Sequence, residues 1–236
     1  MKFTEENYEN VKILLENIDV RKDRIITTVD NGDIVVIPSR KYPLKNKKDI
    51  NIFTSENTEK LNNNGIQKIY DSLDFKIGKC YNNMKLLSKA LLDANITNFK
   101  VYVGWTMVSH NIYPVHHCFI VYDEKYLLDP NAQTNMLIFR EYCEQHPELQ
   151  NDTNKMRLKM VKITREIEKL SFSKKSTFGK ILDDNMIYIA SECKSEEGEK
   201  IYIDLIQAYP NHPIYQRHGM NAHGLSLVQQ MIKNNR

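Results

Sequence analysis

The chain has 236 residues, of which 41% are hydrophobic and 27% charged, a composition that supports a sizeable core and excludes a disordered tail protein. The net charge is +3, and because 33 basic residues are interleaved with 30 acidic ones, no nucleic-acid partner is indicated. The longest apolar runs fall far short of the roughly 18 residues that a membrane helix needs. We therefore expect a soluble protein with a single domain over residues 1–236.

The beginning of the chain shows no pattern of a secretory signal. Residues 3 to 17 form an acidic amphipathic stretch without an apolar segment or a small-residue cleavage pattern. This predicts a cytoplasmic location, although a specialised export route would leave no mark. The cysteines include no C-x-x-C pair, which argues against a zinc ribbon and predicts reduced thiols. They are Cys80, Cys118, Cys143 and Cys193.

The N-terminal part, residues 1–50, predicts a helix and a β-hairpin. Apolar residues recur every three or four positions over residues 4 to 17, which is typical of an amphipathic helix. The β-branched runs 24 to 29 and 33 to 37 are joined through Asn31-Gly32, a pair that favours a tight hairpin turn, and Pro38 ends the second strand. Residues 39 to 50 are expected to form a connecting loop.

The middle of the chain predicts two helical segments and then three strands. Residues 56 to 74 show a weak helical pattern broken by the run from Asn62 to Gly65. A sharper pattern follows, because apolar residues spaced by three and four form one stripe: Cys80, Met84, Leu87, Leu91 and Ala94. Strands are then predicted at residues 100 to 108, 116 to 122 and 125 to 128, with a turn at Asp123-Glu124.

The C-terminal extension, residues 132–236, is predicted to be mainly helical. Helical patterns cover residues 136 to 143 and 156 to 170, a strand-like run covers 200 to 207, and a final helix is expected over 225 to 232. The order of elements predicts an α+β fold in which a helix packs on an antiparallel sheet, with extra helices.

Cys80 stands where the sharpest helix begins. The first turn of a helix supplies N–H groups and the positive end of the helix dipole, which stabilise a thiolate. Gly78 allows a sharp turn into the helix, and Lys79 adds a positive charge. Because Cys80 belongs to the apolar stripe, we expect it to face the sheet, which must then offer a base.

The base is expected from two adjacent histidines. Strand alternation sends His116 and His117 to opposite faces, so only one can face Cys80. If the following strands pair as a hairpin centred near residue 124, Asp129 lies roughly opposite residue 119 and within two positions of His117. A carboxylate at that spacing can orient an imidazole, and Asp129 before Pro130 is expected to end its strand.

These residues resemble a known family. Gly78-x-Cys80-Tyr81 opening a helix, then His117-Cys118-Phe119, then Leu128-Asp129-Pro130, looks like the transglutaminase-like branch of the papain-like cysteine enzymes. The resemblance covers about residues 76 to 131 within a core of about 66–131, and it implies a papain-like or transglutaminase-like fold. Carried over, Cys80 is the nucleophile, His117 the base and Asp129 its orienting group. Phe119 stands where the family usually has Trp, and His116 leaves the choice of base ambiguous.

The resulting hypothesis is a thiol-dependent acyl-transfer enzyme that works through an acyl-enzyme on Cys80. Peptidase, amidase, deamidase and transglutaminase reactions share this first half, so the substrate is a peptide, a protein or a small amide, and no cofactor or metal is required. The oxyanion-binding group stays open between Gln67 and the Cys80 N–H with the Asn82 or Asn83 side chain.

Two other hypotheses about the function fit the same residues. One is a catalytically inactive papain-like binding module, in which Cys80 is an inert core thiol. The other is a metal-dependent hydrolase that uses the cluster formed by His110, His116, His117 and Cys118, although adjacent strand residues point to opposite faces and cannot all share one ion. Trp105 and the late histidines His212, His218 and His223 are interpreted as packing residues that could border the cleft.

Overall fold

A computed structural model describes most of the middle of the chain. The described residues are 18–21, 24–28, 34–38, 47–76, 78–108, 111–133, 145–149, 152–184 and 186–208. They form a mixed α+β structure in which every strand pair with a defined register is antiparallel, as the sequence predicted.

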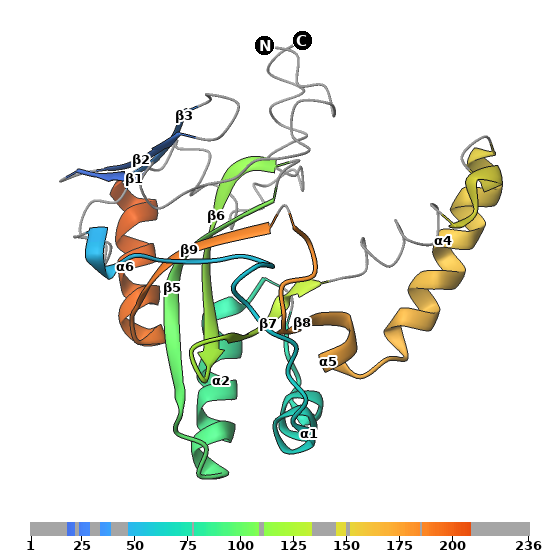
Figure 1. Ribbon diagram of the computed structural model, residues 1–236, viewed down its shortest axis with the longest axis horizontal. Coiled ribbons are helices and arrows are strands. Elements are labelled where there is room, and N and C mark those ends of the chain that lie inside the picture. The colour runs from blue at the N-terminus through green and yellow to red at the C-terminus, as the bar shows by residue number, and fades with distance from the viewer. Residues whose placement is uncertain are drawn as a thin grey trace. The chain divides into compact units, whose positions relative to one another are not determined.

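The described elements follow one another as the colours in Figure 1 show. The helices are α1 (Asn64–Ser72), α2 (Cys80–Asp93), α4 (Thr153–Glu168), α5 (Phe172–Lys175) and α6 (Ser195–Ala208), with short 3-10 helices η3 (Lys47–Asp49) and η4 (Pro147–Leu149). The strands are β1 (Ile18–Val20), β2 (Arg24–Thr28), β3 (Ile34–Pro38), β4 (Asn51–Phe53), β5 (Phe99–Val108), β6 (Asn111–Tyr122), β7 (Tyr126–Gln133), β8 (Ser176–Gly179) and β9 (Met186–Glu192).

The strands form two sheets. One has three strands in the order β1-β2-β3, and the other has six in the order β4-β9-β5-β6-β7-β8. The chain divides into two compact units, of which the first comprises residues 1–54, 101–118 and 185–236 and the second residues 55–100 and 119–184. The boundary falls within β6, after Cys118.

The first unit contains the predicted hairpin and, from the larger sheet, β4, β9, most of β5 and the first part of β6. β2 and β3 pair from Arg24 with Pro38 to Thr28 with Ile34, which confirms the hairpin, and β1 adds a third strand. In the larger sheet, β9 lies between β4 and β5. β5 and β9 approach so closely that a Cβ atom at Gly104 would collide with the backbone oxygen of Ile189. Only glycine therefore fits there.

The core of the first unit comes from both faces of these strands. Residues that are fully buried or nearly so include Val103, Trp105, Tyr188 and Ile189. Tyr202 of α6 is also buried, and Ser195, Gly198 and Tyr202 form one buried helical stripe. The helix thus contributes to the core through one face.

The second unit packs two helices and an aromatic cluster beside β7 and β8. Asn63 caps α1, because its side-chain oxygen accepts hydrogen bonds from the N–H groups of Gly65 and Ile66. Tyr70 of α1 contacts the rings of Phe75, Phe172 and Phe178, with centroid distances of 4.9, 6.1 and 5.1 Å. These edge-to-face and tilted contacts join α1 to α5 and β8.

Two central predictions are confirmed in this unit. Helix α2 begins at Cys80 and buries the predicted stripe as far as Leu91, and Ala94 is its C-cap. The hairpin of β6 and β7 pairs Ile120 with Leu128 and Tyr122 with Tyr126, which centres it on residue 124. Asp123 and Glu124 both adopt positive φ in its turn.

The predicted end of a strand at Asp129 is wrong. β7 continues to Gln133, although Pro130 has no N–H to donate. The pairing of β7 with β8 jumps from Asp129 with Thr177 to Gln133 with Ser176, so Pro130 lies in an irregular stretch where no regular partner is needed.

The predicted strand over residues 200 to 207 is also wrong, because these residues belong to α6. The helix begins at Ser195, and Glu196 and Glu197 in its first turn interact favourably with the positive end of the helix dipole. Likewise, the run from Asn62 to Gly65 does not break a helix but starts α1. The central strand β9 was not predicted at all.

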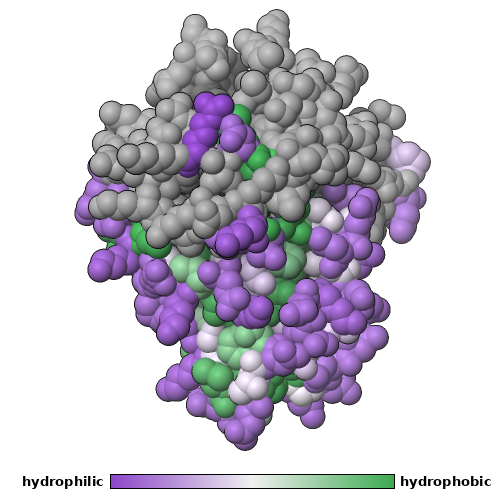
Figure 2. Space-filling model, turned by 60° about the vertical axis from the view of Figure 1, so that its left-hand side comes forward, coloured by the Kyte–Doolittle hydropathy of each residue, from purple (hydrophilic) through white to green (hydrophobic). Residues whose placement is uncertain are grey.

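Other predictions lie wholly or partly outside the described residues. These are the helices over residues 4 to 17, 136 to 143 and 225 to 232, and the turn at Asn31-Gly32. Within the described part, no helix is both long enough and apolar enough to cross a membrane. On the face drawn in Figure 2, hydrophilic side chains surround scattered hydrophobic ones. The exposed Leu86 and Leu92 of α2 are examples of hydrophobic residues at the surface.

Candidate functional site

Cys80 is the first residue of α2 and is 6% exposed. The N-cap residue, Lys79, makes no side-chain hydrogen bond to the helix, and the first turn contains no acidic residue. N–H groups in the first turn of a helix have no partner within the helix. The surroundings of the thiol therefore include the positive end of the dipole without an acidic side chain in that turn.

The loop before Cys80 makes a tight turn. Gly78 adopts a φ of +74° although a Cβ atom there would meet no atom within 4 Å, so backbone conformation rather than space requires the glycine. The N–H of Lys79 donates to the carbonyl of Lys76 over 3.2 Å. The loop thus turns at Gly78 and leads directly into the helix at Cys80.

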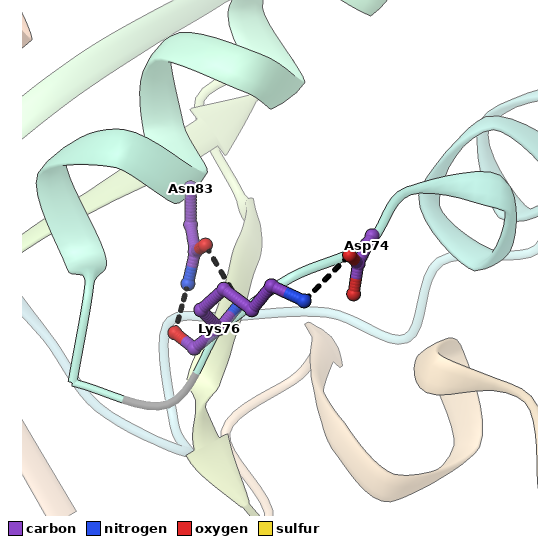
Figure 3. A network of polar contacts seen from close by, with 3 residues as sticks. All are labelled: Asp74, Lys76 and Asn83. Atoms are coloured by element: carbon purple, nitrogen blue, oxygen red, sulfur yellow. Dashed lines mark hydrogen bonds and ion pairs between the residues drawn. The ribbon is translucent and has the colours of Figure 1, made fainter.

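Asn83, one helical turn after Cys80, is hydrogen-bonded to the backbone of this loop at Lys76 (Figure 3). Its Oδ1 accepts a hydrogen bond from the Lys76 N–H over 3.0 Å, and its Nδ2 donates to the Lys76 carbonyl over 2.8 Å. The Lys76 side chain points away and pairs with Asp74 at the surface. Asn83 is 3% exposed, so its amide is paired inside the protein rather than with solvent.

The same amide connects α2 to the strand that carries Asp129. The Asn83 Nδ2 also donates to the Oδ1 of Asn131 over 3.1 Å, and the backbone N–H of Asn131 donates to the Oδ1 of Asp129 over 2.9 Å. The elements that carry Cys80 and Asp129 are therefore joined within the second unit. Asn83 and Asn131 were not predicted in this role, although an amide at a buried position of a helix stripe is a signal that could have been read.

Asp129 is fully buried and lies beside a buried phenol. The Tyr70 hydroxyl lies 3.0 Å from the Ser176 Oγ and donates to the Thr177 carbonyl over 3.4 Å. Burial raises the pKa of Tyr70 well above its usual value, and the negative charges of Asp129 and Asp71 raise this pKa further. Tyr70 is therefore a neutral, fully buried hydrogen-bond donor in the second unit.

The two histidines have different surroundings in the first unit. The His116 ring stacks on Tyr202 of α6 with a centroid distance of 4.4 Å and meets the edge of Trp105 at 5.6 Å. Both histidines are buried, with exposed fractions of 2% for His116 and 6% for His117. The His117 ring lies 6.0 Å from the ring of Tyr188 on β9. Each histidine thus contacts a different set of aromatic side chains, as strand alternation predicted.

The three predicted catalytic residues are distributed over both units. Cys80 and Asp129 belong to the second unit, in which α2 and β7 contact each other. His117 belongs to the first unit and is followed by Cys118, the last residue before the boundary within β6. The pairing of the Cys80 thiol with the His117 imidazole stays a prediction.

The two other described cysteines, Cys118 and Cys193, are buried in the protein. Neither is part of a disulfide, and Cys143 lies outside the described residues. Burial, and to a lesser extent the charge of Glu197, raises the pKa of Cys193 to about 11. Cys193 therefore carries its proton near neutral pH.

The hydrogen bonds and exposure of the side chains bear on which of them could bind an oxyanion. The amide of Asn83 uses its nitrogen for Lys76 and Asn131, so it is already engaged with protein groups. Asn82 is exposed and Gln67 is partly exposed on α1.

Among the described residues, no three His, Cys, Asp or Glu side chains are grouped to hold a metal ion, and His110 and the late histidines lie outside that part of the chain.

Comparisons with protein-family models, with curated proteins and with solved structures found no match for this chain.

Proposed function

We propose that the protein is a thiol-dependent acyl-transfer enzyme of the transglutaminase-like, papain-like type, with Cys80 as nucleophile, His117 as base and Asp129 as its orienting group. The observation that carries the proposal is that hydrogen bonds join the segment around Cys80 to the segment around Asp129. The turn leading to Cys80 contacts Asn83, and Asn83 contacts Asn131 beside Asp129. A scaffold that holds a thiol and a carboxylate in this way suits a catalytic triad.

The position of Cys80 supports its role as nucleophile. A thiolate at a helix N-terminus interacts with the N–H groups and the positive dipole of the first turn. Lys79 supplies a positive charge next to it, and no acidic side chain in that turn opposes the effect. These features favour a reactive thiol over an inert core cysteine.

The surroundings of the two histidines support His117 as the base. The ring of His116 is stacked on Tyr202 and bordered by Trp105, which is the environment of a packing residue. His117 precedes Phe119 by two residues, and strand alternation therefore places both on one face of β6. The printed register of the hairpin ends at the pair of Ile120 with Leu128, the residues next to Phe119 and Asp129.

The proposed reaction has two balanced steps. His117 takes the proton of Cys80, and the sulfur attacks the carbonyl carbon of the substrate and forms a C–S bond. The bond from that carbon to the leaving nitrogen or oxygen then breaks, and His117 gives its proton to the leaving group. Water or an amine next gives a proton to His117 and attacks the thioester, the C–S bond breaks, and the released Cys80 thiolate takes that proton back from His117.

The proposal is tested by the selectivity of the thiols. We expect iodoacetamide at neutral pH to label Cys80 faster than Cys118 or Cys193, as measured by mass spectrometry of peptides. With p-nitrophenyl acetate as an activated ester, we expect an acetyl group to accumulate on Cys80. Cys80→Ser is the matched control and should remain unacetylated under the same conditions.

Equal labelling of the three described cysteines, with no acetyl group on Cys80, would contradict the proposal. That result would favour the alternative of an inactive papain-like binding module. In that case the buried positions of Cys80 and Asp129 would serve only to pack the scaffold.

A further inference from the structure

We propose that Asn83 is a positioning residue of this site, which holds the turn before Cys80 and the Asp129 carboxylate in a fixed relation. This inference rests on the proposed function, since it assigns a role in a site that Cys80 and Asp129 would form. Asn83 does not touch the reacting atoms in the proposal. It acts through Lys76 on one side and through Asn131 on the other.

The hydrogen bonds define the orientation of the Asn83 amide. One backbone residue, Lys76, supplies both a donor and an acceptor, and this requires Oδ1 to face the Lys76 N–H and Nδ2 to face the Lys76 carbonyl. The second hydrogen of Nδ2 then reaches Asn131, which must present its Oδ1. The orientations of both amides therefore follow from the backbone of Lys76.

Asn83 occupies a position where an apolar residue would otherwise be expected. It is buried in the first turns of α2, next to Met84, and asparagine is a poor helix former. A buried amide is tolerated only when its polar atoms are paired. Asn83 makes three side-chain hydrogen bonds, which satisfies this requirement.

The Asn83 side chain makes two sets of hydrogen bonds, which we call the two arms of its network: one to the Lys76 backbone and one to the Asn131 side chain. The two arms contact different parts of the site. The Lys76 carbonyl accepts from both the Lys79 N–H and the Asn83 amide, so its position determines how the chain enters the helix at Cys80. On the other arm, Asn131 donates its backbone N–H to Asp129. Asn83 is the residue that contacts both arms.

The test uses Asn83→Ala with Asn64→Ala as the matched control. Asn64 is the same residue type, is exposed, and lies at the first position of α1. We expect Asn83→Ala to slow iodoacetamide labelling of Cys80 at neutral pH about tenfold and to move the midpoint of the pH profile upward by about one pH unit. Asn64→Ala should leave both values unchanged.

A second readout does not depend on chemistry at Cys80. In Asn83→Ala, we expect the amide hydrogens of Lys76 and Asn131 to exchange faster with solvent, whereas that of Met84 in the helix should change less. If Asn83→Ala does not fold, Asn131→Ala tests one arm alone. It should speed exchange at residue 131 and leave Lys76 protected by Asn83.

The outcomes separate this inference from the proposed function. An unchanged pH profile and unchanged hydrogen exchange in Asn83→Ala would overturn the positioning role, while selective labelling of Cys80 in the wild-type chain would still support the enzyme. An inert Cys80 in the wild-type chain would instead reject the proposed function. Faster exchange at both Lys76 and Asn131 would then show that the hydrogen bonds of Asn83 stabilise the fold alone, which also overturns the inference.

Discussion

Cys80 and Cys193 are two buried thiols at the beginnings of two helices, and their surroundings differ. Cys80 is the first residue of α2, whose first turn contains no acidic side chain. Cys193 precedes α6 by two residues, and the first turn of α6 carries Glu196 and Glu197. Burial and the charge of Glu197 raise the pKa of Cys193 to about 11. A helix N-terminus alone is therefore not enough to make a thiol reactive. Since Cys80 and Cys193 are similarly buried, the acidic side chains in the first turn of α6 are what distinguishes their surroundings.

The two thiols also differ in the contacts around them. The Cys193 Sγ donates to the carbonyl of the adjacent Lys194 over 3.5 Å, which is a bond of the protonated thiol. The turn before Cys80 is instead fixed by Asn83, whose amide bonds the Lys76 backbone. One region keeps a proton on sulfur, and the other has the features expected around a nucleophile.

The largest expected effect is that of Cys80→Ser. This nearly isosteric change should leave the fold intact and lower acyl transfer by several orders of magnitude, because a hydroxyl in place of the thiol is a poor nucleophile. The measurement is the rate of acyl transfer from p-nitrophenyl acetate, with circular dichroism as the check on folding. Cys193→Ser is the matched control and should keep the activity.

Activity of Cys80→Ser above about a hundredth of that of the wild-type chain would exclude Cys80 as the nucleophile. A loss of activity in Cys193→Ser with an intact fold would reverse the comparison between the two thiols.

The next largest effect is expected from His117→Ala. Loss of the base should remove acyl transfer and slow the alkylation of Cys80, since no imidazole would take the thiol proton. His116→Ala is the paired variant and should retain activity while lowering the free energy of unfolding by about 2 kcal/mol, because it removes a stacked ring from the core. The measurements are the rate of acyl transfer and the unfolding transition.

His116→Phe sharpens this pair, since it keeps a flat ring against Tyr202 and Trp105 and should restore most of the lost stability. An inactive but folded His116→Ala together with an active His117→Ala would show that the base is His116 and that the assignment based on strand alternation is wrong.

The fold could be predicted where local pattern determines structure. The apolar stripe from Cys80 to Leu91 specified α2, and the turn at Asp123-Glu124 specified the register of β6 and β7. The strand β9 was missed although it pairs with both β4 and β5. Its residues from Ile187 to Ala190 are buried on both faces, so they show no alternation that would mark a strand. Residues 200 to 207 were misassigned because β-branched residues such as Ile201 and Ile203 favour strands, although in α6 Ile203 is exposed.

The candidate site could be predicted only in part. The types and order of Cys80, His117 and Asp129 are properties of the sequence, whereas the link through Asn83 and Asn131 depends on contacts between residues 48 positions apart. Such a link has no local pattern. The surroundings of His116 likewise come from Tyr202 on a distant helix, and only the structure identifies its partner.

A smaller effect is expected from Asp129→Asn. The change keeps the Oδ1 that accepts a hydrogen bond from the Asn131 N–H. Strand β7 and the hydrogen bonds of Asn83 should therefore remain intact. The loss of the carboxylate should leave the imidazole of His117 poorly oriented and lower acyl transfer, but less than His117→Ala does, by roughly a hundredfold. Labelling of Cys80 should still occur. A fully active Asp129→Asn would contradict the orienting role and leave Asp129 as a structural group.

The smallest effect concerns Cys193. In Glu197→Gln, the loss of a negative charge should lower the pKa of Cys193 from about 11, but not to its ordinary value of 9.0, because burial is the larger cause of the shift. The thiolate fraction at a fixed alkaline pH should therefore rise, and iodoacetamide should label Cys193 several times faster there. Glu196→Gln removes a charge from the same turn and is the matched control. Equal acceleration in both variants, or none in Glu197→Gln, would show that Glu197 has no specific effect on this thiol. Because Cys80 and Cys193 are similarly buried, with exposed fractions of 6% and 7%, the contrast between the two thiols would then fail.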